Sequence, residues 1–482
     1  MIEGYDKMDK LMLISIMLVS TIIISLIIIK QYNRNKRLDS FCFFSLSYII
    51  YFYIIPILVI CFLADKVSSK DRFSFSIINA PIEEHVFAVF TSILGYILFY
   101  ISYVFINKIK LKSITNKNKK CCYEIRYNLI KKIAWIIFII GFSSEVYLIF
   151  KLGGIRSSLS MIELLRSGSI EKTRYVSSNM LFVFTIYTWI HAATFMYLAI
   201  YRIKRTRINF IMFIISMCGS IYALLLAGGR LQIILFITCF FYDYARKKFK
   251  HYLLAMIIIS IGIIISLAGM DNLFYYLTYG YVPDWNTASI SSILEEFAFP
   301  YANLVNVRMF NKIYGLRCGI DFIGWLTYLI PSKILSFLGV NRIEHGYILI
   351  SEFYNGVNSN RGTVPTDCLT LGYRQFGIFG IYIIMIIYAL MCIFIDKRVD
   401  KIDGKIFDFI SIRILMLLFI IVPYADIENF VRGHFSTIIL LIVVNIAFNK
   451  IDMRIKKHGD YYINSNIFSK GSYNEFLANS KL

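Results

Sequence analysis

The sequence predicts an all-α, polytopic integral membrane protein in which one large loop interrupts a series of transmembrane helices. Hydrophobic residues make up 58% of the 482 positions, and the mean hydropathy is +0.65. Many apolar stretches reach the roughly 20 residues that cross about 30 Å of hydrocarbon. A soluble domain cannot bury so much apolar surface. We therefore expect a single membrane domain over 1–482 with about 11 spans, at 11–29, 41–63, 86–106, 133–150, 180–201, 209–227, 231–243, 252–270, 375–395, 406–424 and 434–449.

The positions of the positive charges predict the orientation of these spans. Of the 51 Lys and Arg residues, 31 lie in six segments that would share one side, namely 30–40, 107–132, 202–208, 244–251, 396–405 and the tail 450–482. Short loops rich in Lys and Arg stay in the cytoplasm. We expect the N-terminus outside and the tail inside. The net charge of +21 then reflects topology and attraction to anionic lipid headgroups rather than a nucleic-acid partner.

The segment from 271 to 374 is the large loop, and it is expected outside the cytoplasm. It is too apolar for a disordered linker and too long for a plain connection. Residues 289–311 predict a helix bent at Pro300, and 320–338 predict two short amphipathic pieces broken at Pro331. Such pieces typically lie in the headgroup interface.

Cationic side chains in the outer segments suit an anionic, lipid-linked substrate. The large loop holds, among aromatic and apolar residues, Arg308, Arg317, Arg342, His345, Arg361 and Arg374. Arg166 and Arg174 lie in the outer loop after the fourth span, where they could cradle a second lipid pyrophosphate or only solvate the loop. A guanidinium binds two phosphate oxygens at once and stays charged at every pH.

A tight outer hairpin, LLLAGGRLQIIL, joins the sixth and seventh spans. Gly228 and Gly229 allow close backbone packing there, so Arg230 would be a fixed guanidinium aimed at a phosphate. The alternative is an arginine that snorkels to lipid headgroups.

Other chemistry finds little support in the sequence. The cytoplasmic loops contain no phosphate-binding glycine loop, and no metal-ligand spacing occurs, so we expect neither a cofactor nor a metal. Cys318 and Cys368 share the large loop. Their spacing leaves both a disulfide and two free thiols open.

Three segments in their order carry a family resemblance: LLLAGGRLQIIL, then RGTVPTDCLTLGYRQFGIFGIYI entering a span, then ENFVRGHFSTIILL at the last hairpin. Together they resemble the Wzy-type oligosaccharide repeat-unit polymerases, over most of 133–449. The resemblance implies a GT-C-like fold and pyrophosphate binding by Arg230, Arg361 and Arg432. The family's R-x10-G pattern occurs twice, from Arg308 to Gly319 and from Arg361 to Gly372, although here in one loop rather than two.

The resemblance also implies a reaction. A growing glycan on undecaprenyl pyrophosphate would be transferred to an incoming lipid-linked repeat unit, in O-antigen (lipopolysaccharide) or capsule synthesis at the outer face of the bacterial inner membrane. The partners would be that lipid-linked oligosaccharide, membrane lipid and a chain-length regulator protein. Arginines would stabilise the leaving pyrophosphate without a metal. His345 would be the first choice of general base, followed by Asp367 and Glu352.

Three alternatives stay open. A lipid-linked oligosaccharide flippase would have a similar composition, but typically with two repeated halves and short loops. A polyprenyl-phosphate-sugar glycosyltransferase would need a carboxylate in an early outer loop, for which Glu83 and Glu84 are candidates. An O-antigen ligase uses the same donor as a polymerase and differs only in the acceptor.

Overall fold

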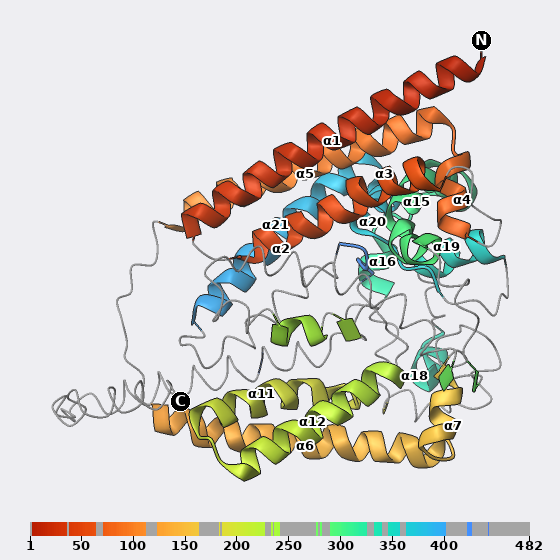
Figure 1. Cartoon of the computed structure of the whole chain (residues 1–482). Coiled ribbons are helices and arrows are strands. Elements are labelled where there is room, and N and C mark those ends of the chain that lie inside the picture. Colours follow the sequence, from red (N-terminus) through yellow and green to blue (C-terminus); the bar gives the residue numbers. More distant parts are fainter. Residues whose placement is uncertain are drawn as a thin grey trace.

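The computed structural model is helical throughout the part of the chain that it describes (Figure 1). The described residues are 2–35, 38–63, 71–111, 123–162, 183, 186–226, 233–234, 236–241, 276–277, 280–281, 290–324, 332–339, 346–356, 363–401, 422–426 and 442.

Six helices are long and apolar enough to cross a membrane, and each coincides with an expected span. They are Met8–Asn35, Ser40–Phe62, Ile82–Lys108, Asn128–Lys151, Arg207–Leu226 and Ile378–Lys397. These helices indicate a multi-pass membrane protein. The span expected at 180–201 is a shorter helix, α11 (Trp189–Ile203, 15 residues). Of the span expected at 231–243, the structure describes 233–234 and 236–241. The spans expected at 252–270, 406–424 and 434–449 lie mostly or wholly outside the described residues, as does the tail 450–482.

The first group of helices begins with α1 (Ile2–Asn35), which packs against the second span and α5 (Ile82–Leu111). Its outer face is apolar, since the exposed fractions of Met12, Ile22 and Leu26 are 66%, 59% and 60%. Such a surface is unfavourable in water, and lipid tails would cover it.

The second span contains a π turn. It consists of α2 (Ser40–Ile49), η1 (Ile50–Ile54) and α3 (Ile55–Phe62) without a break. A π turn inserts one extra residue into the helical repeat. Here the three consecutive rings of Tyr51, Phe52 and Tyr53 are all fully buried, as are six consecutive residues at the start of α2, so neighbouring helices surround this span.

Helix α15 (Ile290–Tyr314) contains Pro300, as predicted. It packs against α3, α4 (Arg72–Asn79), α5 and α20. Its middle is buried, including Ala298, Tyr301, Ala302 and Leu304. Neighbouring helices therefore cover more than one of its faces, a degree of enclosure that the sequence did not predict.

The two short pieces expected in 320–338 are present as α16 (Ile320–Gly324) and α18 (Ser332–Phe337). In α18 the ring of Phe337 is 88% exposed, as suits a helix that touches lipid.

A helical hairpin follows α19 (Gly346–Asn355) and is made of α20 (Cys368–Phe376) and α21 (Ile378–Lys401). Gly377 joins its two helices with φ +62°, a conformation that favours glycine. A Cβ on Gly372 would lie 2.9 Å from the carbonyl oxygen of Gly380. The glycine of the second R-x10-G pattern thus permits close helix packing.

The second group consists of α6 (Tyr123–Lys151), α7 (Ile155–Ser160), α11 and α12 (Arg207–Leu226), drawn at the bottom of Figure 1. Ile190 of α11 fits between two glycines. A Cβ on Gly141 of α6 would lie 2.8 Å from the Ile190 nitrogen, and one on Gly219 of α12 would collide with the Ile190 side chain. The three long helices therefore approach closely at this level.

Candidate functional site

A stripe of buried polar side chains runs through the first group of helices where α15, α16, α19 and α20 come together, at the right of the upper group in Figure 1. Several of its polar atoms have no hydrogen-bond partner among the described residues. Buried polar atoms are normally paired, so a cluster of unpaired ones indicates a place for water or a ligand. We call this stripe the polar lane; it consists of Asn303, Thr366, Asp367, Thr370, Arg374 and Asp426.

The polar lane begins at the N-terminus of α20. Asp367 is the N-cap residue, and its Oδ1 accepts hydrogen bonds from the backbone nitrogens of Leu369 at 3.0 Å and Thr370 at 2.9 Å. Such a cap satisfies donors that the first helical turn leaves unpaired. Asp367, Thr370 and Arg374 are three and four residues apart, so they share one face of the helix.

The described segment 422–426 runs alongside this N-terminus and adds Asp426 to the lane. The Cys368 nitrogen donates to the Val422 oxygen at 2.9 Å, and the Ala425 nitrogen donates to the Thr366 oxygen at 2.7 Å. Asp426 Oδ2 accepts from the Thr366 nitrogen at 2.8 Å. Asp426 lies 60 positions from Thr366 in the chain, and this contact brings it to the N-terminus of α20, where Asp367 is the N-cap.

Arg374 is the cation of the lane, and its side chain is almost fully buried, with 1% exposed. Its Nη1 donates to the Gly346 carbonyl at 2.8 Å. Its Nε and Nη2 have no partner among the described residues. These two nitrogens form one edge of the planar guanidinium, the edge that binds two oxygens of a carboxylate or phosphate together. Burial lowers the pKa of Arg374, and the charge of Asp321 opposes that shift.

Asp321 of α16 anchors the surroundings of Arg374. Its carboxylate accepts from Arg317 Nη2 at 2.8 Å, from the Gly346 nitrogen at 3.0 Å and from Gln375 Nε2 at 2.6 Å. One carboxylate therefore connects α16, the start of α19 and the end of α20. Charge-assisted hydrogen bonds of this kind are stronger than neutral ones.

The two carboxyl groups of the lane titrate near neutral pH. Burial raises the pKa of Asp367 and of Asp426 to about 7 in each case. For Asp367, hydrogen bonds from the side chain and backbone of Thr370 oppose the effect of burial. For Asp426, hydrogen bonds from Thr366 and the charge of Arg374 oppose it. Groups that exchange a proton near the working pH suit general acid–base chemistry.

These pKa values predict how stability depends on pH. A carboxyl group whose pKa rises from 3.8 to about 7 on folding binds its proton more tightly in the folded state, so unfolding becomes easier as pH rises between these values and levels off above pH 7. Asp426→Asn keeps an acceptor for the Thr366 nitrogen but does not titrate. Between pH 4 and pH 7, the free energy of unfolding of the wild type should fall further than that of Asp426→Asn. The two decreases should differ by up to about 4 kcal/mol. Denaturation at a series of pH values measures this, and identical profiles would contradict it.

The structure places three further predicted site residues besides Arg374. Asp367 is the buried N-cap of α20, and its Oδ2 has no partner among the described residues. Glu352 is half-buried in α19. Arg308 lies on the exposed side of α15, with Nη1 3.6 Å from Glu84 Oε1 and its guanidinium 5.4 Å from the ring centre of Phe87. The polar lane thus unites Arg374 with Asp367, whereas Arg308 pairs at the surface.

The remaining predicted residues lie outside the described part of the chain: Arg166, Arg174, Arg230, His345, Arg361 and Arg432. Cys318 and Cys368 are free thiols, the first exposed and the second buried.

Sequence reasoning missed Asp321, Asp426 and Asn303. Asp321 follows Arg317 by four residues, the spacing of an ion pair on a helix, and this was an available signal. Asp426 follows an apolar stretch in VPYADIEN, with no pattern that indicates a partner at Thr366. Only the folded chain brings these residues together.

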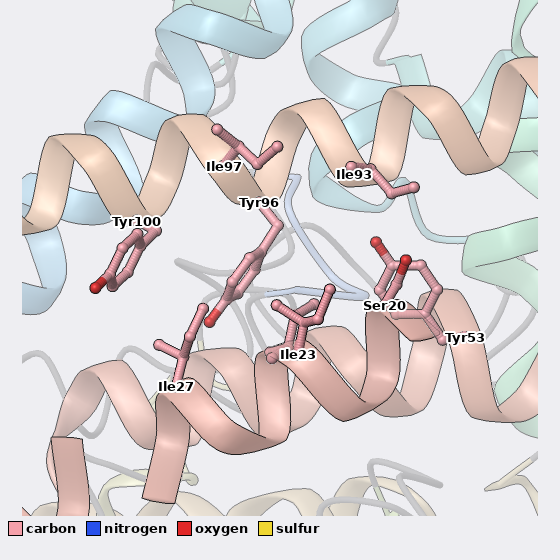
Figure 2. Close-up of a pocket in the computed structure, with 9 residues that line it drawn as sticks. Ser20, Ile23, Ile27, Tyr53, Ile93, Tyr96, Ile97 and Tyr100 are labelled. Atoms are coloured by element: carbon pink, nitrogen blue, oxygen red, sulfur yellow. The ribbon is translucent and has the colours of Figure 1, made fainter. Parts of the chain in front are cut away.

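A separate apolar cavity of about 160 Å³ lies between α1 and α5 (Figure 2). Tyr96 reaches from α5 toward α1, where Ile23 and Ile27 lie opposite, and the hydroxyls of Ser20 and Tyr53 lie at one end. Among the described residues, no charged side chain lines this cavity. It suits a hydrocarbon chain and not an anionic headgroup.

No protein-family model, curated protein or solved structure matches this chain. The functional assignment therefore rests on the geometry of the polar lane and on the sequence patterns.

Proposed function

We propose that this protein is an oligosaccharide repeat-unit polymerase, a glycosyltransferase that moves a growing glycan from undecaprenyl pyrophosphate onto an incoming lipid-linked repeat unit. One observation carries the proposal. Arg374 presents an unpaired bidentate edge inside a buried site that also holds Asp367 and Asp426. A pyrophosphate oxygen pair fits that edge.

The chemistry requires two kinds of group. The acceptor hydroxyl oxygen attacks the anomeric carbon of the donor sugar, the bond from that carbon to the pyrophosphate oxygen breaks, and the pyrophosphate leaves with the electron pair. Fixed cations stabilise the charge that accumulates on the leaving group, and they do so more strongly away from water. Arg374 supplies this role, together with Arg230, Arg361 and Arg432 as the family resemblance implies.

The acceptor proton must go to a base. His345 is the first candidate, because it directly precedes Gly346, whose carbonyl accepts from Arg374 Nη1. Asp367, Asp426 and Glu352 are the further candidates. A carboxyl with a pKa of about 7, as at Asp426, can take a proton at neutral pH.

The same proposal includes the finer topology. It has eleven spans, the N-terminus and the large loop 271–374 outside the cytoplasm, and the site at the outer face of the bacterial inner membrane. The six apolar helices and the distribution of Lys and Arg support it. A chain-length regulator would be the protein partner, as the resemblance implies.

The test is direct extension of purified lipid-linked repeat units by the full-length protein in detergent, without ATP, sugar nucleotides or divalent ions. We expect longer lipid-linked glycans, seen on gels and by mass spectrometry. A flippase would form no glycosidic bond in this assay, and a ligase would need its own acceptor. Absence of extension with the correct repeat unit, or complete dependence on added Mg²⁺, would overturn the arginine mechanism.

A further inference from the structure

A carboxylic acid is enclosed in the second group of helices, apart from the polar lane. Glu145 lies on α6 within the apolar span Asn128–Lys151. Its side chain is 2% exposed, and its Oε1 has no hydrogen-bond partner among the described residues. Ionisable groups inside a span are rare and typically functional.

Two glycines explain why the acid fits there. Glu145 follows Gly141 by one helical turn, so both face Ile190 and α12. A Cβ on Gly219 of α12 would lie 2.9 Å from Glu145 Oε2. The missing side chain of Gly219 therefore provides the space that the carboxyl occupies.

The titratable groups around Glu145 are mainly hydroxyls. Tyr187, just before α11, and Tyr222 of α12 lie close enough to interact with it electrostatically. His191 of α11 directs Nε2 to the Ser220 carbonyl at 3.2 Å. Among the described residues no cationic side chain pairs with Glu145. An ionised carboxylate without such a partner is very unfavourable in these surroundings, and the protonated acid is the form that fits.

A short hydroxyl path leads from this level toward α7. Tyr222 and Ser158 of α7 share a hydrogen bond with 2.5 Å between their oxygens. Glu145 is six residues before Lys151, the last residue of α6, which is roughly 9 Å along the helix axis. Tyr222 is half-buried, Ser158 is fully buried, and α7 packs against both α6 and α12.

We propose that Glu145 is a proton-binding site of this protein, which holds a proton in the packing described here and exchanges it through Tyr222 and Ser158 at the α7 end. Loss of the proton would place a charge between α6, α11 and α12 and favour a looser packing of these helices. The site does not depend on the proposed polymerase function.

Infrared spectroscopy of the full-length protein in lipid nanodiscs tests the protonation. The difference between wild type and Glu145→Gln at neutral pH should contain a carboxylic-acid carbonyl band, because Gln removes the acid and keeps its shape. Glu84→Gln, at the ion pair with Arg308 in which Glu84 is half-buried, is the comparison variant and should leave the Glu145 carbonyl band unchanged. If Glu145→Gln loses only a carboxylate band, the proposal is overturned.

Two further measurements complete the test. A hydrophobic carbodiimide adds across a protonated carboxyl, whose proton moves to a carbodiimide nitrogen, and mass spectrometry of the wild type should find the adduct on Glu145. Protection by sodium ions would mean a bound cation and contradict the proposal. Tyr222→Phe combined with Ser158→Ala should slow hydrogen–deuterium exchange of the Glu145 band at least about tenfold, and an unchanged rate would refute the path.

Discussion

Arg374→Lys is expected to lower the rate of lipid-linked glycan extension by about 10²–10³-fold, the loss typical of removing one donor that stabilises an anionic transition state. Lysine keeps a positive charge and can still reach the Gly346 carbonyl that Arg374 Nη1 contacts at 2.8 Å. It cannot replace the two parallel donors of the unpaired Nε and Nη2 edge. The loss should therefore appear in kcat more than in KM, because charge accumulates on the pyrophosphate as its bond breaks.

Arg308→Lys is the matched control. Arg308 is exposed and already paired with Glu84, so this substitution should change the rate little. Extension rates of purified variants, together with their melting temperatures, separate a catalytic loss from misfolding. Normal extension by a folded Arg374→Lys protein would show that Arg374 has a structural role only, while extension by the wild type would still support the polymerase assignment.

Asp321→Ala is expected to lower the free energy of unfolding by about 3–5 kcal/mol, the effect of breaking a buried ion pair from one side. The substitution removes the acceptor of Arg317 Nη2, the Gly346 nitrogen and Gln375 Nε2. It also removes the negative charge that opposes the desolvation of Arg374. The Gly346 nitrogen and Gln375 Nε2 would lose a buried acceptor, and Arg317 and Arg374 would each lose a nearby negative charge.

The ion pair between Arg308 and Glu84 provides the comparison for this prediction. Its side chains are 47% and 26% exposed, and exposed pairs contribute about 0–1 kcal/mol. Glu84→Ala should therefore change stability much less than Asp321→Ala, as measured by denaturant unfolding in one detergent. Equal effects would mean that Asp321 does not anchor α16, α19 and α20 in the way the hydrogen bonds indicate.

Part of the candidate site could be predicted because its residues belong to one continuous segment. Asp367 and Arg374 both lie in RGTVPTDCLTLGYRQFGIFGIYI, and their spacing places them on one helix face. Their surroundings are remote in the chain, since Asp426 contacts Thr366 across 60 positions and Asp321 contacts Gln375 across 54. Hydrogen bonds across such separations leave no periodic signal in a single sequence.

The sequence alone did not indicate a role for Glu145, for a related reason. One acid in the long apolar segment Asn128–Lys151 does not prevent the prediction of a span, and its neighbour Gly219 is 74 positions away. The significance of the acid depends on whether α12 supplies a partner. Among the described residues, α12 instead offers the space left by a glycine.

The sequence by itself determined the helical, multi-pass character of the protein, because the length and hydropathy of a span are properties of consecutive residues. It also determined that 320–338 forms short separate pieces, observed as α16 and α18, because proline disfavours a continuous helix. Only the tertiary structure decided that α15 is enclosed by other helices and that Arg374 keeps one edge unpaired beside Asp321. Burial and hydrogen-bond pairing depend on which surfaces meet, and the meeting of α15, α16, α19 and α20 is decided by packing across the whole chain.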